Sequence, residues 1–142
     1  MIITFFGHSD YCAKKADEER LLSFLEETVG VSPVTFYLGG YGAFDSFARV
    51  CARKFQRAHK NVKLVMVTPY LNKKVPLDLY DETVYPPLEN VPPRFAISHR
   101  NLWMVEQANV VVVYVVRSFG GAAQACAHAR KQKKLIFDLS RQ

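Results

Sequence analysis

The sequence reads Val34-Thr35-Phe36-Tyr37-Leu38-Gly39-Gly40-Tyr41-Gly42-Ala43-Phe44-Asp45 where an apolar run passes through three glycines into a helical pattern that continues to about Ala58. Glycine lets a backbone adopt positive φ angles and approach a ligand closely. The helix behind the glycines begins with unpaired N–H groups and the positive end of its dipole, and both favour an anion. This junction predicts a phosphate-binding loop. The alternative is a tight turn that needs glycine for backbone reasons alone.

Strand and helix patterns alternate on both sides of this junction. Several apolar runs are near-continuous and β-branched, which is typical of parallel strands covered on both faces. Strands that alternate with helices form right-handed crossovers and a doubly wound sheet. We predict a single Rossmann-like α/β domain over residues 1–142, with a mainly parallel five-stranded sheet in the order 3-2-1-4-5. The expected strands are Ile2–Phe6, Val34–Leu38, Val62–Val67, Val110–Val116 and Leu135–Leu139, and the expected helices are Asp17–Thr28, Phe44–Ala58, a helix capped by Ser98 and ending at Gln107, and Gly121–Gln132.

The composition indicates one globular protein. The chain has 142 residues, of which 49% are hydrophobic, so it is long enough to bury a core and too apolar to be disordered. No apolar run approaches the roughly 20 residues that span a bilayer. The apolar segment Met1–Phe6 lacks a basic flank and a cleavage site, so it predicts a first strand and not a signal peptide. We therefore expect a cytoplasmic protein that does not bind membranes.

Charge and cysteine content bear on the possible partners. The formal net charge of +6 suits an anionic ligand or nucleic acid. The basic residues gather at 49–63 and 130–134, near the ends of helix patterns, where cations also complement the helix dipole and solvate the surface. The three cysteines and four histidines have no metal-ligand spacing, so we expect reduced thiols, no metal site and no resident cofactor.

Residues 69–97 break the alternation of strands and helices. This segment holds six prolines and three tyrosines and has no clear periodicity. A loop of this length in a compact domain is unusual and often functional. It follows the third expected strand, at the edge where ligands of open α/β sheets bind. We expect a Pro/Tyr-rich insertion that serves either as a lid or as a surface for forming a homo-oligomer.

Glycine-rich turns follow three of the expected strands at this same edge. In the order 3-2-1-4-5 the second and fourth strands both neighbour the first, so the three turns should meet around one crevice. Asp45 opens a helix and either caps it or accepts a hydrogen bond from a ribose, and Arg100 has the geometry to bind phosphate. Tyr41 is placed to stack on a base. A structural or surface role is the alternative for His8, Arg100 and Ser118. The expected ligand-binding residues are Gly7, His8, Ser9, Gly39, Gly40, Tyr41, Gly42, Asp45, Arg100, Asn101, Ser118, Gly120 and Gly121.

Four segments carry a resemblance to the SLOG superfamily, which joins the DNA-processing Smf/DprA proteins with the lonely-guy phosphoribohydrolases. The run 39–48 resembles that superfamily's Gly-Gly-x-x-Gly-x-Asp-x-x-Ala loop. The turn Gly7-His8-Ser9 and the loop Ser118–Ala122 are similar to its other two glycine turns, and 104–112 resembles the entry to its fourth strand. The block at 80–97 further resembles an uncharacterised bacterial subfamily. The resemblance implies a Rossmann-like fold and a nucleotide-related ligand.

The sequence departs from the catalytic motifs of these relatives. The phosphoribohydrolase motif Pro-Gly-Gly-x-Gly-Thr-x-x-Glu supplies a glutamate, and a related deoxyribosyltransferase motif would put its nucleophile at Gln124. Here no acid occurs between Ala122 and Ala127, and glutamine cannot titrate. Another acid can take over only if it lies beside the reacting carbon. Asp45 and Glu106 are the weak catalytic candidates, and Glu89 is a further acid of this kind.

These observations favour a nucleotide-binding or sensing module over an enzyme. The first alternative is an N-glycosidic hydrolase or transferase that acts on nucleoside monophosphates. The second is a nucleic-acid-binding protein, which a basic stripe across one face would favour. The expected partner is a nucleotide-like small molecule, with nucleic acid and a second copy of the chain as further candidates.

Overall fold

A six-stranded sheet forms the centre of the molecule in the computed structural model, which describes residues 1–71 and 78–141. The strand order is β4-β3-β2-β1-β5-β6, and every described pairing is parallel. The predicted order of the five expected strands is confirmed, and a sixth strand is added at one edge. The strands are β1 (Ile2–Gly7), β2 (Val34–Leu38), β3 (Val62–Val67), β4 (Glu82–Val84), β5 (Val110–Tyr114) and β6 (Leu135–Asp138).

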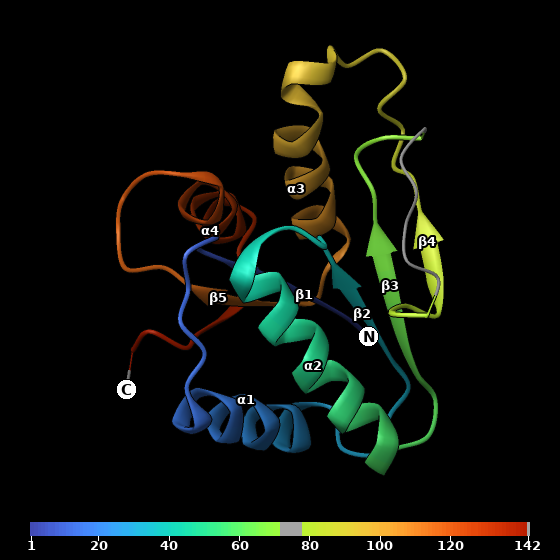
Figure 1. Ribbon diagram of the computed structural model, residues 1–142, viewed down its shortest axis with the longest axis vertical. Helices are drawn as coiled ribbons and strands as arrows, with labels where there is room; N and C mark the ends of the chain where they lie inside the picture. Colours follow the sequence, from blue (N-terminus) through green and yellow to red (C-terminus); the bar gives the residue numbers. More distant parts are fainter. Residues whose placement is uncertain (72–77, 142) are drawn as a thin grey trace.

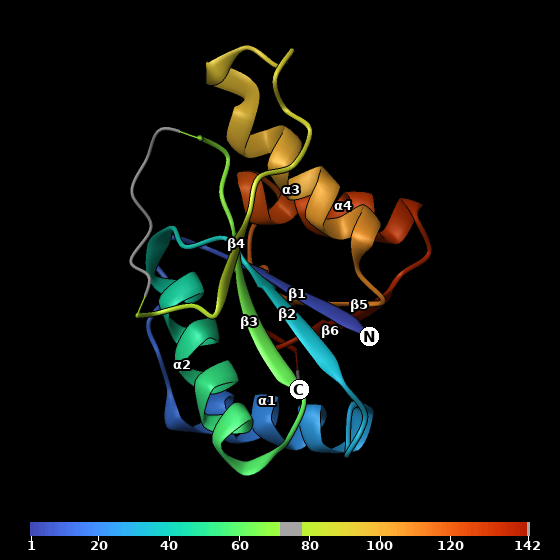
Figure 2. The ribbon, with the colours of Figure 1, turned by 90° about the vertical axis from the view of Figure 1, so that its right-hand side faces the viewer.

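Helices cover both faces of this sheet. Figure 2 shows α1 and α2 on one side of the strands and α3 and α4 on the other. The strands that follow β1 are added first on one side of it, beginning with β2, and then on the other side, beginning with β5 (Figure 1). A sheet wound in both directions leaves a crevice at the carboxyl ends of its strands. The helices are α1 (Lys15–Thr28), α2 (Gly42–Ala58), α3 (Ala96–Gln107) and α4 (Gly121–Lys131).

Two apolar clusters fix these layers. Phe5, Phe36 and Phe44 are fully buried between the sheet and the α1–α2 layer. On the opposite face, Met104 of α3 and the alanines of α4 pack on the strands. The small side chains of α4 let this helix lie close to the sheet, which explains its alanine-rich sequence. Burial of this much apolar surface supplies the main driving force for folding.

The Pro/Tyr-rich insertion is partly regular structure, which corrects the expectation of a loop without periodicity. Residues Glu82–Val84 form β4, which pairs with β3 at the edge of the sheet. Asp81, just before this strand, accepts hydrogen bonds from the Leu64 backbone at 2.9 Å and from the Gln56 side chain at 2.8 Å. Arg53 completes the attachment with an ion pair to Asp81 at 3.2 Å. The insertion is therefore attached to the sheet at residues 81–84, and Pro76 lies outside the described residues.

The start of α3 also differs from the expectation. A short 3-10 helix, Pro93–Phe95, leads directly into α3 at Ala96, so Ser98 lies inside the helix and is not its N-cap. Proline fixes φ near the helical value and lacks an N–H that a first turn would leave unpaired, so Pro93 can start this turn well ahead of Ser98. Within the described residues, no helix is long and apolar enough to cross a membrane.

Candidate functional site

A cavity of about 290 Å³ lies at the carboxyl ends of β1, β2 and β5. This is the edge at which the strand order reverses, and open α/β sheets bind their ligands there. Its volume is at the lower end of the range for small-molecule sites. The cavity is lined by Phe5, Phe6, Gly7, His8, Ser9, Gly39, Tyr41, Asp45, Ile97, Arg100, Asn101, Arg117, Gly120, Gly121 and Ala122.

Most of the residues expected at the ligand site border this one cavity. Ten of the thirteen lie in its wall: Gly7, His8, Ser9, Gly39, Tyr41, Asp45, Arg100, Asn101, Gly120 and Gly121. The remaining three, Gly40, Gly42 and Ser118, are absent from the wall. The cavity therefore collects residues from three separate turns and from α3.

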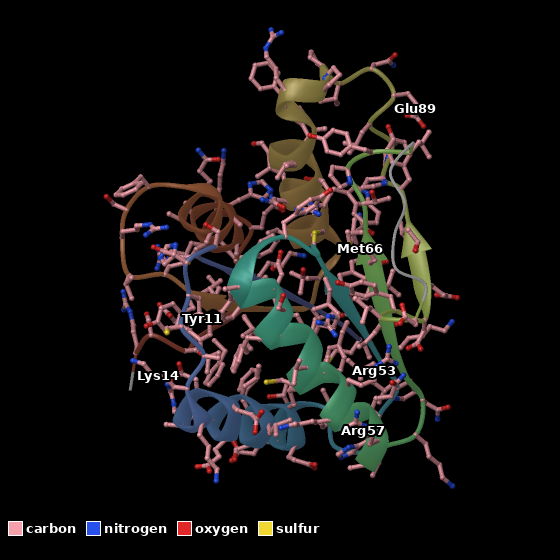
Figure 3. The ribbon with its side chains drawn as sticks, in the orientation of Figure 1. Tyr11, Lys14, Arg53, Arg57, Met66 and Glu89 are labelled. Carbon is pink, nitrogen blue, oxygen red and sulfur yellow. The ribbon has the colours of Figure 1, made fainter. Side chains whose placement is uncertain are left out.

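Gly40 and Gly42 serve the packing of the protein. Both have positive φ angles, +76° and +87°, which side-chain-bearing residues rarely adopt. A Cβ atom at Gly40 would lie 2.5 Å from the sulfur of Met66, and one at Gly42 would lie 2.9 Å from the Cα of Ser9. Figure 3 shows Met66 reaching from β3 toward the loop that precedes α2. Their positive φ angles and the atoms that a side chain would meet both call for glycine at these positions, and a role of their backbone in ligand binding stays a prediction.

Arg100 binds the first residue of the glycine loop through a hydrogen bond. Its side chain is only 3% exposed although it contributes to the cavity wall. One guanidinium nitrogen, Nη1, donates to the carbonyl oxygens of Gly39 and Val67, both at 2.8 Å. These carbonyls follow β2 and end β3, so Arg100 ties α3 to two neighbouring strands. Its Nε donates to Asn101 at 3.0 Å, and the guanidinium carbon lies 5.5 Å from the centre of the Tyr41 ring.

Asp45 lies in the first turn of α2 and closes the same loop. Its Oδ2 accepts a hydrogen bond from the backbone N–H of Tyr41 at 2.7 Å. Burial raises the pKa of Asp45 to about 6, although the Tyr41 N–H and the nearby Arg100 charge favour the carboxylate and lower it. The cost of burying the charged carboxylate therefore exceeds the stabilisation that the Tyr41 N–H and Arg100 give it.

The raised pKa of Asp45 predicts a pH-dependent stability. The folded protein keeps this proton up to about pH 6, whereas the unfolded chain releases it near the ordinary value of 3.8. Folding thus takes up a proton between these values, and its contribution to stability falls as the pH rises through this window, by about 3 kcal/mol in total. Urea unfolding at pH 4 to 7 should show this decline relative to Asp45→Asn, which cannot titrate. Parallel stability profiles for the two proteins would contradict the assignment.

His8 supports the turn after β1. Its Nε2 accepts a hydrogen bond from the Val116 N–H at 3.0 Å, so the neutral ring carries its proton on Nδ1. Burial lowers the pKa of His8, and the charge of Arg117 lowers it further. His8 is therefore a neutral histidine that joins the turn after β1 to the loop after β5.

Arg117 is a cavity-lining residue that the sequence reasoning missed, and Asp10 is the carboxylate that faces it. Arg117 lines the cavity, and its Nη1 and Nη2 lie 3.3 and 3.4 Å from the two carboxylate oxygens of Asp10. Their positions in the sequence could have indicated this. Arg117 directly precedes Ser118 at the end of a predicted strand, and Asp10 directly follows the turn 7–9. Charged residues next to the glycine turns should therefore be counted as candidates when a ligand site is predicted from sequence.

Glu106 lies away from this cavity. It is near the end of α3, and α3 runs back from the carboxyl edge of the sheet to the start of β5. Its surroundings are the chain before β6, where Lys134 donates to the Glu106 carbonyl oxygen at 3.1 Å, and His128, which lies 3.9 Å from its carboxylate. Glu89 does not border the cavity either. In residues 1–71 and 78–141 there is no group of three metal-ligating side chains.

No family model matches the sequence, and no curated protein matches it. Solved structures do match. The first is the X-ray structure of TM1055, a structural-genomics target, with a TM-score of 0.60 at 16% identity over 95% of this chain and 71% of that one. The second is DNA processing protein A from Helicobacter pylori, described in its single-stranded DNA binding mode, with a TM-score of 0.61 at 13% identity over 97% of this chain. The third is the molybdenum cofactor carrier protein from Chlamydomonas reinhardtii, with a TM-score of 0.59 at 19% identity over 99% of this chain and 78% of that one.

The chain shares the overall fold of these three proteins. The likeness extends over almost the whole chain, so it includes the sheet, both helix layers and the edge that holds the cavity. The chain spans only 64% of the length of the Helicobacter pylori protein. At identities below 20% these structures show a shared fold alone, and the ligand of this chain has to be argued from its own site. Membership of the SLOG superfamily and of its bacterial subfamily stays a prediction.

Proposed function

We propose that the protein binds a nucleotide or nucleotide-derived ligand through its phosphate, as a binding or sensing module. The observation that carries this proposal is the convergence of two helix starts and one arginine on the cavity. Tyr41 and Asp45 come from the start of α2, Gly120 and Gly121 from the start of α4, and Arg117 from the loop before α4. Backbone N–H groups and dipoles at helix starts attract anions, and a guanidinium adds charge and paired donors.

The start of α4 supports the position of the phosphate. No side chain caps this helix, and its first turn contains no acid. Its first N–H groups therefore have no competing carboxylate from their own turn. At the start of α2, by contrast, Asp45 already occupies the Tyr41 N–H. A phosphate is accommodated best on the α4 side of the cavity.

Tyr41 supports a base or another flat group on the α2 side. Its ring is 40% exposed at the cavity wall, with Arg100 beneath it. An exposed aromatic ring that is held by a cation offers a surface for stacking. Stacking of a base on an aromatic side chain contributes about 1–3 kcal/mol.

An N-glycosidic hydrolase is the less well supported function. Asp45 is the single acid among the residues that line the cavity, and its Oδ2 is engaged by the Tyr41 N–H. Gln124, at the position of the transferase nucleophile, has no acid–base chemistry. A nucleotide-binding protein without turnover needs neither group.

Nucleic-acid binding is favoured by the fold shared with a protein described as binding single-stranded DNA. The ion pairs formed by the basic residues of this chain are evidence against nucleic-acid binding. Arg53, Lys54 and Lys63, in the larger basic cluster, pair with Asp81, Glu18 and Glu82 respectively. Figure 3 shows Arg53 and Arg57 on the second half of α2, away from its start at the cavity. Cations that are paired with carboxylates in this way indicate a solvated surface and not a phosphate-tracking stripe.

Calorimetric titration tests the proposal. Nucleoside mono-, di- and triphosphates, cyclic dinucleotides and NAD are each compared with the matching unphosphorylated nucleoside. We expect at least one phosphorylated compound to bind and its nucleoside to bind far more weakly. Tyr41→Ala should weaken the nucleotide roughly tenfold and leave inorganic phosphate unchanged, as stacking energies imply. Val50→Ala is the control, because Val50 is also exposed on α2 but lies outside the cavity.

Two outcomes would redirect the proposal. If no nucleotide binds more tightly than its nucleoside, the phosphate site is wrong. If chromatography finds free base released from AMP, GMP or CMP above a blank, and Asp45→Ala abolishes the release, the protein is an N-glycosidase. We expect no free base.

A further inference from the structure

Arg117 has the least complete set of hydrogen bonds of the charged groups at the cavity. Its Nε is buried and has no partner, a condition that only one other side-chain nitrogen or oxygen, in His128, shares within the described residues. Its two terminal nitrogens lie 3.3 and 3.4 Å from Asp10. Guanidinium–carboxylate pairs are usually closer, at about 2.7–2.9 Å. Arg117 therefore has donor capacity that Asp10 does not satisfy.

The carboxylate that faces Arg117 is easy to replace. The Asp10 side chain is 71% exposed and that of Arg117 is 34% exposed. Ion pairs in contact with water contribute little to stability, so exchanging the partner costs little. The backbone next to Arg117 is fixed independently, because the Val116 N–H is bound to His8. The guanidinium can thus change its partner while the loop stays in place.

The Arg117–Asp10 pair also connects the segment after β1 with the segment after β5. Asp10 follows β1, and Arg117 lies in the loop between β5 and α4. Phe119 lies beside the guanidinium, with its ring centre 5.3 Å from the guanidinium carbon. An anion that enters the cavity at the start of α4 therefore meets Arg117 at a point where a carboxylate already competes for it.

We infer that Arg117 is a phosphoryl-binding residue of this cavity and that Asp10 is its built-in competitor, displaced when a phosphoryl group binds. The inference deepens the proposed function and rests on the same cavity. A phosphoryl group offers three acceptor oxygens, so the two terminal nitrogens of Arg117 that Asp10 releases bind it as a fork while the N–H groups at the start of α4 bind the remaining oxygen. Asp10 then sets the affinity, since its charge opposes every anion that approaches.

The test uses the protein labelled with nitrogen-15, titrated with inorganic phosphate, AMP and adenosine and observed through the Nε–H resonance of Arg117. Loss of this signal in Arg117→Lys assigns it. We expect phosphate and AMP to shift the resonance and adenosine to leave it in place. Asp10→Asn should bind phosphate at least about threefold more tightly, and Arg117→Gln should bind it roughly tenfold or more weakly.

Glu82→Gln is the matched control. It also removes one carboxylate from an exposed ion pair, with Lys63 at 3.2 Å, and it changes the net charge by the same amount away from the cavity. If Asp10→Asn binds phosphate no more tightly than this control, or if the Arg117 resonance does not move at saturation, the inference is wrong. Arg117→Lys keeps the charge but loses the fork, so an affinity equal to that of the wild type would also contradict it.

The results separate this inference from the proposed function. AMP binding that is indifferent to Asp10 and Arg117 leaves the nucleotide site standing and ends the inference. A shift of the Arg117 resonance by free phosphate, with AMP binding no tighter than phosphate, supports the inference and contradicts a nucleotide ligand. No response to phosphate or AMP in any variant contradicts both.

Discussion

Gly7→Ala should lower the free energy of unfolding by about 3 kcal/mol, the upper part of the range for forcing extra atoms into a packed core. A Cβ at this position would lie 2.1 Å from Cγ of Phe44. That ring is fully buried and packs edge-on against Tyr11 at 5.2 Å, so it has no free space into which it can move. For a domain of this size the change corresponds to a fall in melting temperature of roughly 10 °C. Urea denaturation followed by circular dichroism measures it.

Gly121→Ala is the control for this prediction. A Cβ there meets Asn101 at 3.6 Å, which is an ordinary contact, and alanine is the better helix former at the start of α4. Its stability should remain within about 0.5 kcal/mol of the wild type. Equal stabilities of Gly7→Ala and Gly121→Ala would show that the turn after β1 can relax, and that Gly7 is not needed for packing.

Arg100→Met should destabilise the protein by roughly 3 kcal/mol, because it leaves two carbonyl oxygens and a charged neighbour without their partner. The Gly39 and Val67 carbonyls each lose a donor at 2.8 Å, and Asp45 loses the nearby positive charge. Methionine fills a similar volume, so the loss reports on the hydrogen bonds and the charge more than on a cavity. Unfolding by urea at pH 7 gives the value.

The position of Arg100 also determines how its loss affects binding. Because Nη1 is committed to the two strand ends, Arg100→Met should weaken a nucleotide and its unphosphorylated nucleoside by similar factors, through distortion of the glycine loop. Arg94→Met is the control, since Arg94 is an exposed arginine just before α3. A loss confined to the phosphorylated ligand, in a variant as stable as this control, would instead make Arg100 a direct phosphate ligand.

The glycines of the turn after β2 are required for more than one reason. The sequence motif suggested that Gly40 and Gly42 admit a ligand to the backbone. Their positive φ angles agree with the need for glycine, but Met66 and Ser9 fill the space where a side chain would go. Only the packing of residues that are distant in sequence distinguishes a glycine that faces a ligand from one that faces the protein.

The sequence by itself determined the layered architecture and the edge at which the site lies. Near-continuous β-branched runs and helical spacings are local signals, and their alternation indicates right-handed crossovers and a doubly wound sheet. The strand Glu82–Val84 escaped this reasoning, because three residues carry no periodicity and the strand exists only through its pairing with β3 and the anchoring of Asp81. The partners of Arg100 and Arg117 were decided in the same way. Each depends on which distant carbonyl or carboxylate the fold brings within hydrogen-bonding distance, and that information is present only in the tertiary structure.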